Sequence, residues 1–77
     1  MNIDPSTVKL IISGLTIALG TIMPAFAISK IGSEALKAIS RNPEATSKIQ
    51  TAMLLAIAFA ESIAIYVLVM AIIIKFI

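Results

Sequence analysis

The sequence of 77 residues contains no cysteine and no histidine, and only 13% of its residues are charged. Without cysteine there is no disulfide framework and no thiol chemistry. Without histidine, zinc sites and acid–base catalysis by imidazole are nearly excluded. The net charge of +2 is small and the basic residues are spread along the chain, which indicates no nucleic-acid partner. No hydrophilic stretch suggests a separate soluble domain, so a cytosolic enzyme is not expected.

Apolar residues make up 60% of the chain. A soluble domain of this size buries only a modest fraction of its surface, so lipid has to cover the remainder. The runs Leu10 to Ser29 and Ala52 to Ile74 are each about long enough to cross a hydrocarbon core as a helix. The N-terminus lacks the positive n-region of a signal peptide, so the first span is predicted to be permanent.

Glu61 is the one charged residue between Ala52 and Ile74, and it lies close to the middle of that run. A charged side chain at this depth costs about 3 kcal/mol on insertion scales, so it indicates a functional site. The alternative is a hydrogen-bonding group that only holds helices together. Asn, Gln or Ser would do that at lower cost, which favours the functional interpretation.

Small residues recur along the first span with steps of three and four, which keeps them on one helix face. In lipid such a face lets helix backbones approach closely, although alanine and glycine are also simply common in membrane helices. The predicted packing residues are Gly14, Ala18, Thr21, Ala25, Ser29 and Gly32. Ala52, Ala56, Ala60 and Ala64 form a shorter stripe on the second span.

The whole chain, residues 1–77, is predicted to form a single helical hairpin. Asp4 and Pro5 are typical of a helix start, so helix one is expected over about residues 5–40, with a mild bend at Pro24. A polar loop is expected over about 41–43, with Asn42 as the cap of helix two. Helix two is expected over about 44–76.

Basic residues predict the orientation of this hairpin. Lys30, Lys37, Arg41 and Lys48 lie in or beside the loop, whereas Lys9 and Lys75 flank the other ends. The positive-inside rule therefore predicts a cytoplasmic loop, with both termini on the opposite side of the membrane.

Three features follow one another along the chain: the small-residue first helix, the turn Arg41-Asn42-Pro43-Glu44-Ala45, and the segment Ala58-Phe59-Ala60-Glu61-Ser62 followed by Tyr66. A hairpin with these features resembles the c subunit of the F-type ATP synthase. The resemblance covers nearly the whole chain in order and spacing. It is specific, because the loop motif and the buried carboxylate occur together about twenty residues apart.

The resemblance implies an all-α membrane protein whose hairpins assemble into a closed homo-oligomeric ring, the membrane rotor of the F0 sector. The family's ion-carrying carboxylate falls on Glu61, and its stalk contacts fall on Arg41, Asn42 and Pro43. The implied partners are identical subunits, the stator a subunit, the central stalk and lipid. The chain would carry no catalytic site for ATP and no cofactor. A bacterial plasma membrane is the expected location.

Physical reasoning independently predicts a partner for Glu61. The protonated carboxyl group can face lipid, whereas the ionised group needs a cation or water beside it. No residue within the chain's own spans supplies that charge, so another polypeptide with a membrane-buried Arg or Lys must do so. The resemblance identifies this polypeptide as the a subunit.

The transported ion is predicted to be a proton, with sodium as the alternative. Sodium-binding relatives carry a glutamine where this chain has Ile28, and often a hydroxyl residue where it has Ile63. Glu61 with Ser62, and Tyr66 near them, remain as candidate ion-binding residues. A carboxylic acid needs only one acceptor for its proton, whereas sodium needs several oxygen ligands.

Two rival classes fit the composition. One is a holin-like, pore-forming hairpin, which does not require a lone mid-membrane acid beside an Arg-Asn-Pro turn. The other is a structural component of a larger membrane complex, with Glu61 as assembly glue. A Glu61→Gln variant distinguishes these alternatives, because a structural contact would largely survive the substitution whereas ion transport would stop.

Overall fold

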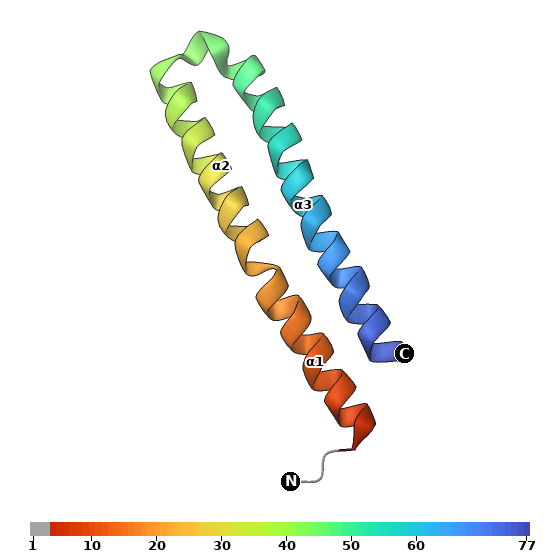
Figure 1. The fold of residues 1–77 in the computed structure, drawn as a ribbon. Helices are drawn as coiled ribbons and strands as arrows, with labels where there is room; N and C mark the ends of the chain where they lie inside the picture. The colour runs from red at the N-terminus through yellow and green to blue at the C-terminus, as the bar shows by residue number, and fades with distance from the viewer. Residues whose placement is uncertain (1–3) are drawn as a thin grey trace.

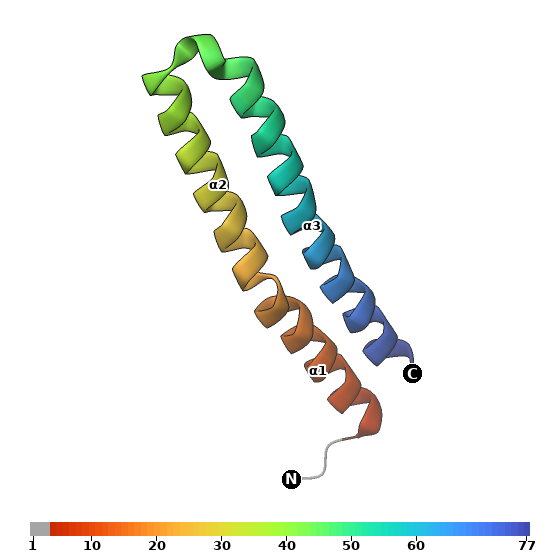
Figure 2. The same ribbon diagram turned by 45° about the horizontal axis from the view of Figure 1, so that its top comes forward.

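The computed structural model describes residues 4–77, all in helices and short connections. Helix α1 spans Pro5–Gly20 and α2 spans Ile22–Arg41. A 3₁₀ turn, η1, spans Pro43–Ala45, and α3 spans Thr46–Phe76. Helices α1 and α2 follow one another along the length of α3, which runs back antiparallel to them (Figure 1 and, turned, Figure 2). The predicted two-helix hairpin is confirmed.

The first long helix bends between α1 and α2, at Thr21. Pro24 has no N–H, so the Gly20 carbonyl lacks its usual donor one turn later. The Thr21 amide and hydroxyl both donate to the Ile17 carbonyl, at 3.2 and 2.7 Å. The Ala25 amide donates to the Thr21 carbonyl at 3.0 Å, so the helical ladder resumes directly. The chain therefore bends without breaking, at a position one turn before the proline.

The connection between the two arms is more regular than the sequence pattern suggests. Asn42 is the one residue between α2 and η1, and its backbone carbonyl accepts the Ala45 amide at 2.9 Å. Its side chain makes no capping hydrogen bond, and regular α-helix begins only at Thr46. The Asp4 side chain likewise caps no backbone amide and instead accepts the Ser6 hydroxyl at 2.7 Å. At the loop, the backbone carbonyl of Asn42 thus accepts an amide in place of its side chain.

Small residues form the seam between the two arms of the hairpin. The buried positions are Ser13, Pro24, Ala35, Ala60 and Ala71. Gly20 allows a close approach, because a β-carbon there would overlap Cγ1 of Val67 and lie 3.0 Å from its Cγ2. No large side chain is fully buried within residues 4–77. The arms therefore associate through close backbone packing rather than through a hydrophobic core.

Nearly all of the apolar surface faces outward. The segments Pro5–Arg41 and Pro43–Phe76 are each long and apolar enough to span a membrane, and only 11% of the most apolar part of each is buried. The backbone extends over 61 × 20 × 8 Å, so it is longer than a hydrocarbon core of about 30 Å. Lipid or further protein has to cover both faces of this thin hairpin.

Candidate functional site

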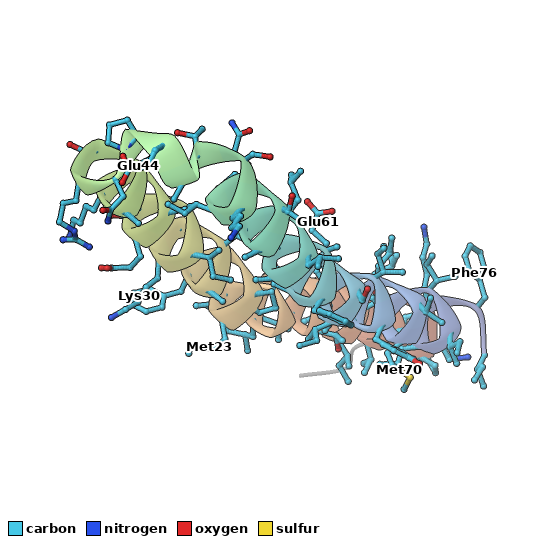
Figure 3. The ribbon with its side chains drawn as sticks, turned by 90° about the horizontal axis from the view of Figure 1, so that it is seen from above. Met23, Lys30, Glu44, Glu61, Met70 and Phe76 are labelled. Carbon is cyan, nitrogen blue, oxygen red and sulfur yellow. The ribbon has the colours of Figure 1, made fainter. Side chains whose placement is uncertain are left out.

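Glu61 lies on a flank of the hairpin rather than in its seam. The preceding residue, Ala60, is only 7% exposed and faces the other arm. Successive residues of an α-helix are about 100° apart, so Glu61 is turned out of the seam and its side chain is exposed. Figure 3 shows this side chain pointing away from the ribbon of α3. A carboxyl group in this position is open to whatever packs beside the hairpin.

No countercharge meets Glu61 within the part of the chain that the structure describes. The ion pair found there joins Lys37 and Glu34 at 3.6 Å, near the loop end of α2. The Glu61 side chain makes neither a salt bridge nor a hydrogen bond with residues 4–77. An ionised Glu61 in lipid would therefore be unpaired.

Ser62 and Tyr66 share the outer face of α3. They line one shallow, largely apolar hollow together with Ile65 and Val69. The Ser62 hydroxyl donates to the Ala58 carbonyl at 2.9 Å, and Tyr66 is 75% exposed. Tyr66 lies five residues after Glu61, which turns it about 140° around the helix. The structure thus brings Ser62 and Tyr66 together, while Glu61 lies on a neighbouring strip of the helix.

The predicted stripe of packing residues is not the seam between the arms. Thr21 and Gly32 are half-buried, whereas the other four members, Gly14, Ala18, Ala25 and Ser29, are exposed. A β-carbon added at Gly14 or Gly32 would meet nothing within 4 Å. The other arm of the hairpin therefore does not cover the stripe. The contact of Gly20 with Val67 was not predicted from the spacing of small residues.

The open stripe lies on the same flank as Glu61. Gly14 lines a groove with Leu68 and Ile72 of α3. Leu68 follows Glu61 by seven residues, which is about two turns, so both lie on one strip of α3. The flank that carries the carboxyl group is also the flank with the smallest side chains of the first arm. A second helix could approach closely there.

Further oxygen ligands are scarce around Glu61. Ile28 is half-buried in α2, and Ile63 is exposed on the opposite flank of α3, where it lines a hollow with Met23 and Pro24. Neither side chain carries an oxygen. Within residues 4–77 no group of three or more His, Cys, Asp or Glu could hold a metal ion.

The turn residues stand at the tip of the hairpin. Arg41, Asn42 and Pro43 are all exposed, where α2 ends and η1 begins. Arg41 makes no ion pair within the described residues. This end of the molecule is free to contact a soluble partner.

Comparison with known proteins identifies this arrangement. A family model that describes the ATP synthase c subunit matches residues 11–74, which include the turn and Glu61. The chain belongs to the family of ATP synthase c subunits. The resemblance predicted from the turn and the lone carboxylate is thereby confirmed.

Individual relatives match over nearly their full length. The chain is 46% identical to the ATP synthase c subunit of Dehalococcoides mccartyi over 74 residues, covering 96% of this chain and 97% of the relative. It is 43% identical to the ATP synthase c subunit of Chloroflexus aurantiacus over 68 residues, covering 88% and 90%. It is 38% identical to that of Prochlorococcus marinus over 76 residues, covering 99% and 94%. Family and hairpin together make this chain a membrane component of an ATP synthase.

Proposed function

We propose that the chain is a rotor-ring subunit of the F0 sector and carries protons on Glu61. The observation that supports this most strongly is the position of Glu61, alone in an apolar helix and open on one flank without a countercharge. The chain then has no catalytic site for ATP and needs no cofactor. The transported proton is its substrate.

Transport follows from the two states of the carboxyl group. The protonated group is neutral and faces lipid while the ring turns. A membrane-buried basic residue of the a subunit stabilises the ionised group and so releases the proton. One carboxyl group per hairpin gives one proton per step. Each charge that crosses 100 mV contributes about 2.3 kcal/mol, which is the driving force for rotation.

The open stripe supports assembly into a closed ring of identical subunits. Gly14, Ala18 and Ala25 leave room for a neighbouring backbone beside Glu61. The first arm forms the inner circle in this arrangement, because the smaller circumference favours the smaller side chains. The exposed turn Arg41-Asn42-Pro43 contacts the central stalk. Its basic surroundings favour a cytoplasmic loop in a bacterial plasma membrane, with both termini outside.

The ligand supply favours a proton over sodium. Ile28 and Ile63 offer no oxygen, and the Ser62 hydroxyl already donates to Ala58. Its oxygen can still accept a hydrogen bond from the protonated Glu61 carboxyl group, and the Tyr66 hydroxyl is a second acceptor if its side chain turns. Sodium coupling remains the alternative because Glu61, Ser62 and Tyr66 are all present.

Labelling with a hydrophobic carbodiimide tests the proposal. The reagent reacts with a protonated carboxyl group reached through lipid, so we expect labelling at Glu61 and not at Asp4, Glu34 or Glu44. Labelling is then repeated with increasing NaCl at fixed pH, with KCl as the ionic-strength control. Even labelling of all four acids would contradict the proton-carrying role. Protection of Glu61 by millimolar sodium but not by potassium would assign the site to sodium.

A further inference from the structure

The face of α2 that points away from α3 carries a polar hollow near the loop end. Its lining residues are Phe26, Ser29, Lys30, Ser33 and Glu34, and its volume is about 250 Å³. All five side chains are exposed. In Figure 3 Lys30 extends from α2 on the side away from α3 and Glu61. Ser29 also belongs to the open stripe, whereas Phe26, Lys30 and Ser33 lie further round α2, so most of the hollow is separate from the flank that carries Glu61.

The two serines of this hollow differ from most other hydroxyl residues in the helices. Ser13, Thr16 and Thr21 each donate to a backbone carbonyl of their own helix. The hydroxyl groups of Ser29 and Ser33 make no hydrogen bond within residues 4–77. Both hydroxyl groups can therefore donate to an external acceptor.

Of the charged groups around the hollow, Lys30 carries a positive charge that no acidic side chain of the described chain balances. Glu34 is paired with Lys37 at 3.6 Å, which reduces its repulsion of an incoming anion. Lys30 makes no ion pair within the described chain. The local charge of Lys30, Glu34 and Lys37 together is positive. The hollow thus offers an ammonium group and two hydroxyl donors to a compact anion.

The depth of the hollow indicates where that anion comes from. Lys30 directly follows the uncharged run Leu10–Ser29, and Phe26 lies one turn deeper. A lysine at the edge of a membrane span extends its ammonium group toward the headgroups while its stem stays among the acyl chains. A ligand that matches this arrangement carries an anionic phosphate above an apolar chain.

We propose that Phe26, Ser29, Lys30 and Ser33 form a binding site for the phosphate headgroup of an anionic phospholipid. Lys30 pairs with the phosphate, the two hydroxyl groups donate to its oxygens, and Phe26 packs against the acyl chain. The site lies within one hairpin. It rests on the proposed function only in that the ring turns this face inward and the loop end toward the cytoplasmic leaflet.

A tryptophan reporter measures lipid binding at this site, because the chain contains no tryptophan of its own. The full-length Phe26→Trp protein is reconstituted in phosphatidylcholine vesicles with brominated phosphatidylglycerol or brominated phosphatidylcholine. The ratio of fluorescence quenching gives the preference for the anionic lipid. We expect a preference of about fivefold, as one lysine near the membrane surface provides. A Met23→Trp reporter, one turn deeper, repeats the measurement without altering a lining residue.

Two variants with the same charge change discriminate the site from diffuse attraction. Lys30→Gln should lower the preference to about one, whereas Lys48→Gln, which removes the same charge from α3 and leaves Glu34 paired with Lys37, should retain most of it. Equal losses in both variants, or no preference in either parent reporter, would overturn the proposal. Carbodiimide labelling of Glu61 in the same vesicles separates the two hypotheses. A protein that labels at Glu61 yet shows no lipid preference refutes the lipid site and leaves the transport role standing.

Discussion

The seam between the arms and the flank that carries Glu61 are both built from small residues, but their surroundings differ. In the seam Gly20 lies so close to Val67 that no β-carbon fits between them. On the flank Gly14 and Gly32 have free space around them. Small residues thus serve two purposes: those in the seam hold the hairpin together, and those on the flank leave it open to a neighbour.

This difference implies that fold and transport can be changed separately. Glu61 makes no hydrogen bond or ion pair within the described hairpin, so replacing it should leave the seam intact. Gly20 lies in the seam and far along the chain from the carboxyl group, so replacing it should act first on stability. Substitutions on the flank and in the seam test this separation.

The largest effect is expected from Glu61→Gln. Glutamine keeps the size and polarity but cannot release a proton, so ATP-driven proton pumping by the assembled synthase should fall to background. The hairpin should persist because Glu61 contributes no contact to the seam, and assembly should persist because glutamine keeps the size and polarity of the side chain on the flank. Pumping is measured with a pH-sensitive dye in vesicles, and assembly by native mass spectrometry.

Glu44→Gln is the matched control, because it removes the same charge from the exposed 3₁₀ turn. Its pumping should stay near the parent rate. If Glu61→Gln instead pumps normally, or if it loses assembly as well, the carboxyl group is a structural contact and the separation of flank from seam is wrong.

A smaller effect is expected from Gly20→Ala. The added methyl group overlaps Val67, and overpacking costs about 1–3 kcal/mol. Removing a glycine from a helix returns about 1 kcal/mol, so we expect a net loss of up to about 2 kcal/mol in hairpin stability. The separation of the arms is followed by energy transfer between dyes on cysteines introduced at Thr7 and Phe76, during titration with a denaturing detergent.

Gly14→Ala is the control on the open flank. Its methyl group meets nothing within 4 Å, so stability should be unchanged or slightly higher. Combining Gly20→Ala with Val67→Ala should recover much of the loss, because the overlapping methyl groups are removed. A destabilisation by Gly14→Ala as large as that by Gly20→Ala would mean that the seam has been assigned to the wrong residues.

The sequence predicted the hairpin, which the structure confirms, and it predicts a transport role for Glu61, because both predictions depend on features that run along the chain. A long uncharged run predicts a membrane span, and a single acid within that run is recognisable whichever way its helix is rotated. The contact between Gly20 and Val67 was not predicted. Gly20 and Val67 are 47 positions apart in the chain, and their contact depends on how the two arms are rotated against each other. The spacing of residues within one helix does not determine that rotation.

The boundaries near the loop differ for a local reason. Asn42 and Pro43 predict a helix start, but the backbone first forms a 3₁₀ turn that pairs Ala45 with the Asn42 carbonyl. A tight turn and a capping side chain can both accept the free backbone amides at a helix start. The sequence alone does not show which of the two is used. Ser62 presents the same ambiguity at the site, because its hydroxyl can bond to Glu61 or to its own helix.

The smallest effect is expected from Ser62→Ala. The Ser62 hydroxyl donates to the Ala58 carbonyl at 2.9 Å, and this bond closes back onto its own helix. When the hydroxyl is removed, the Ala58 carbonyl still accepts its backbone amide within α3. The free energy of unfolding should therefore change by less than about 0.5 kcal/mol. For a bound proton, Ser62 offers one acceptor, and a neutral hydrogen bond contributes about 0.5–1.5 kcal/mol. Water or a nearby carbonyl replaces part of that, so carbodiimide labelling of Glu61 at fixed pH should change threefold or less.

Tyr66→Phe removes the other nearby hydroxyl group and should have no larger effect on labelling. Sodium coupling predicts a different pattern, because a sodium ion loses one of few oxygen ligands when Ser62 is replaced. Sodium would then protect Glu61 in the parent protein, and Ser62→Ala would abolish that protection. That result would make the exposed outer face of α3 part of the ion site, and Glu61 would no longer act through the open flank alone.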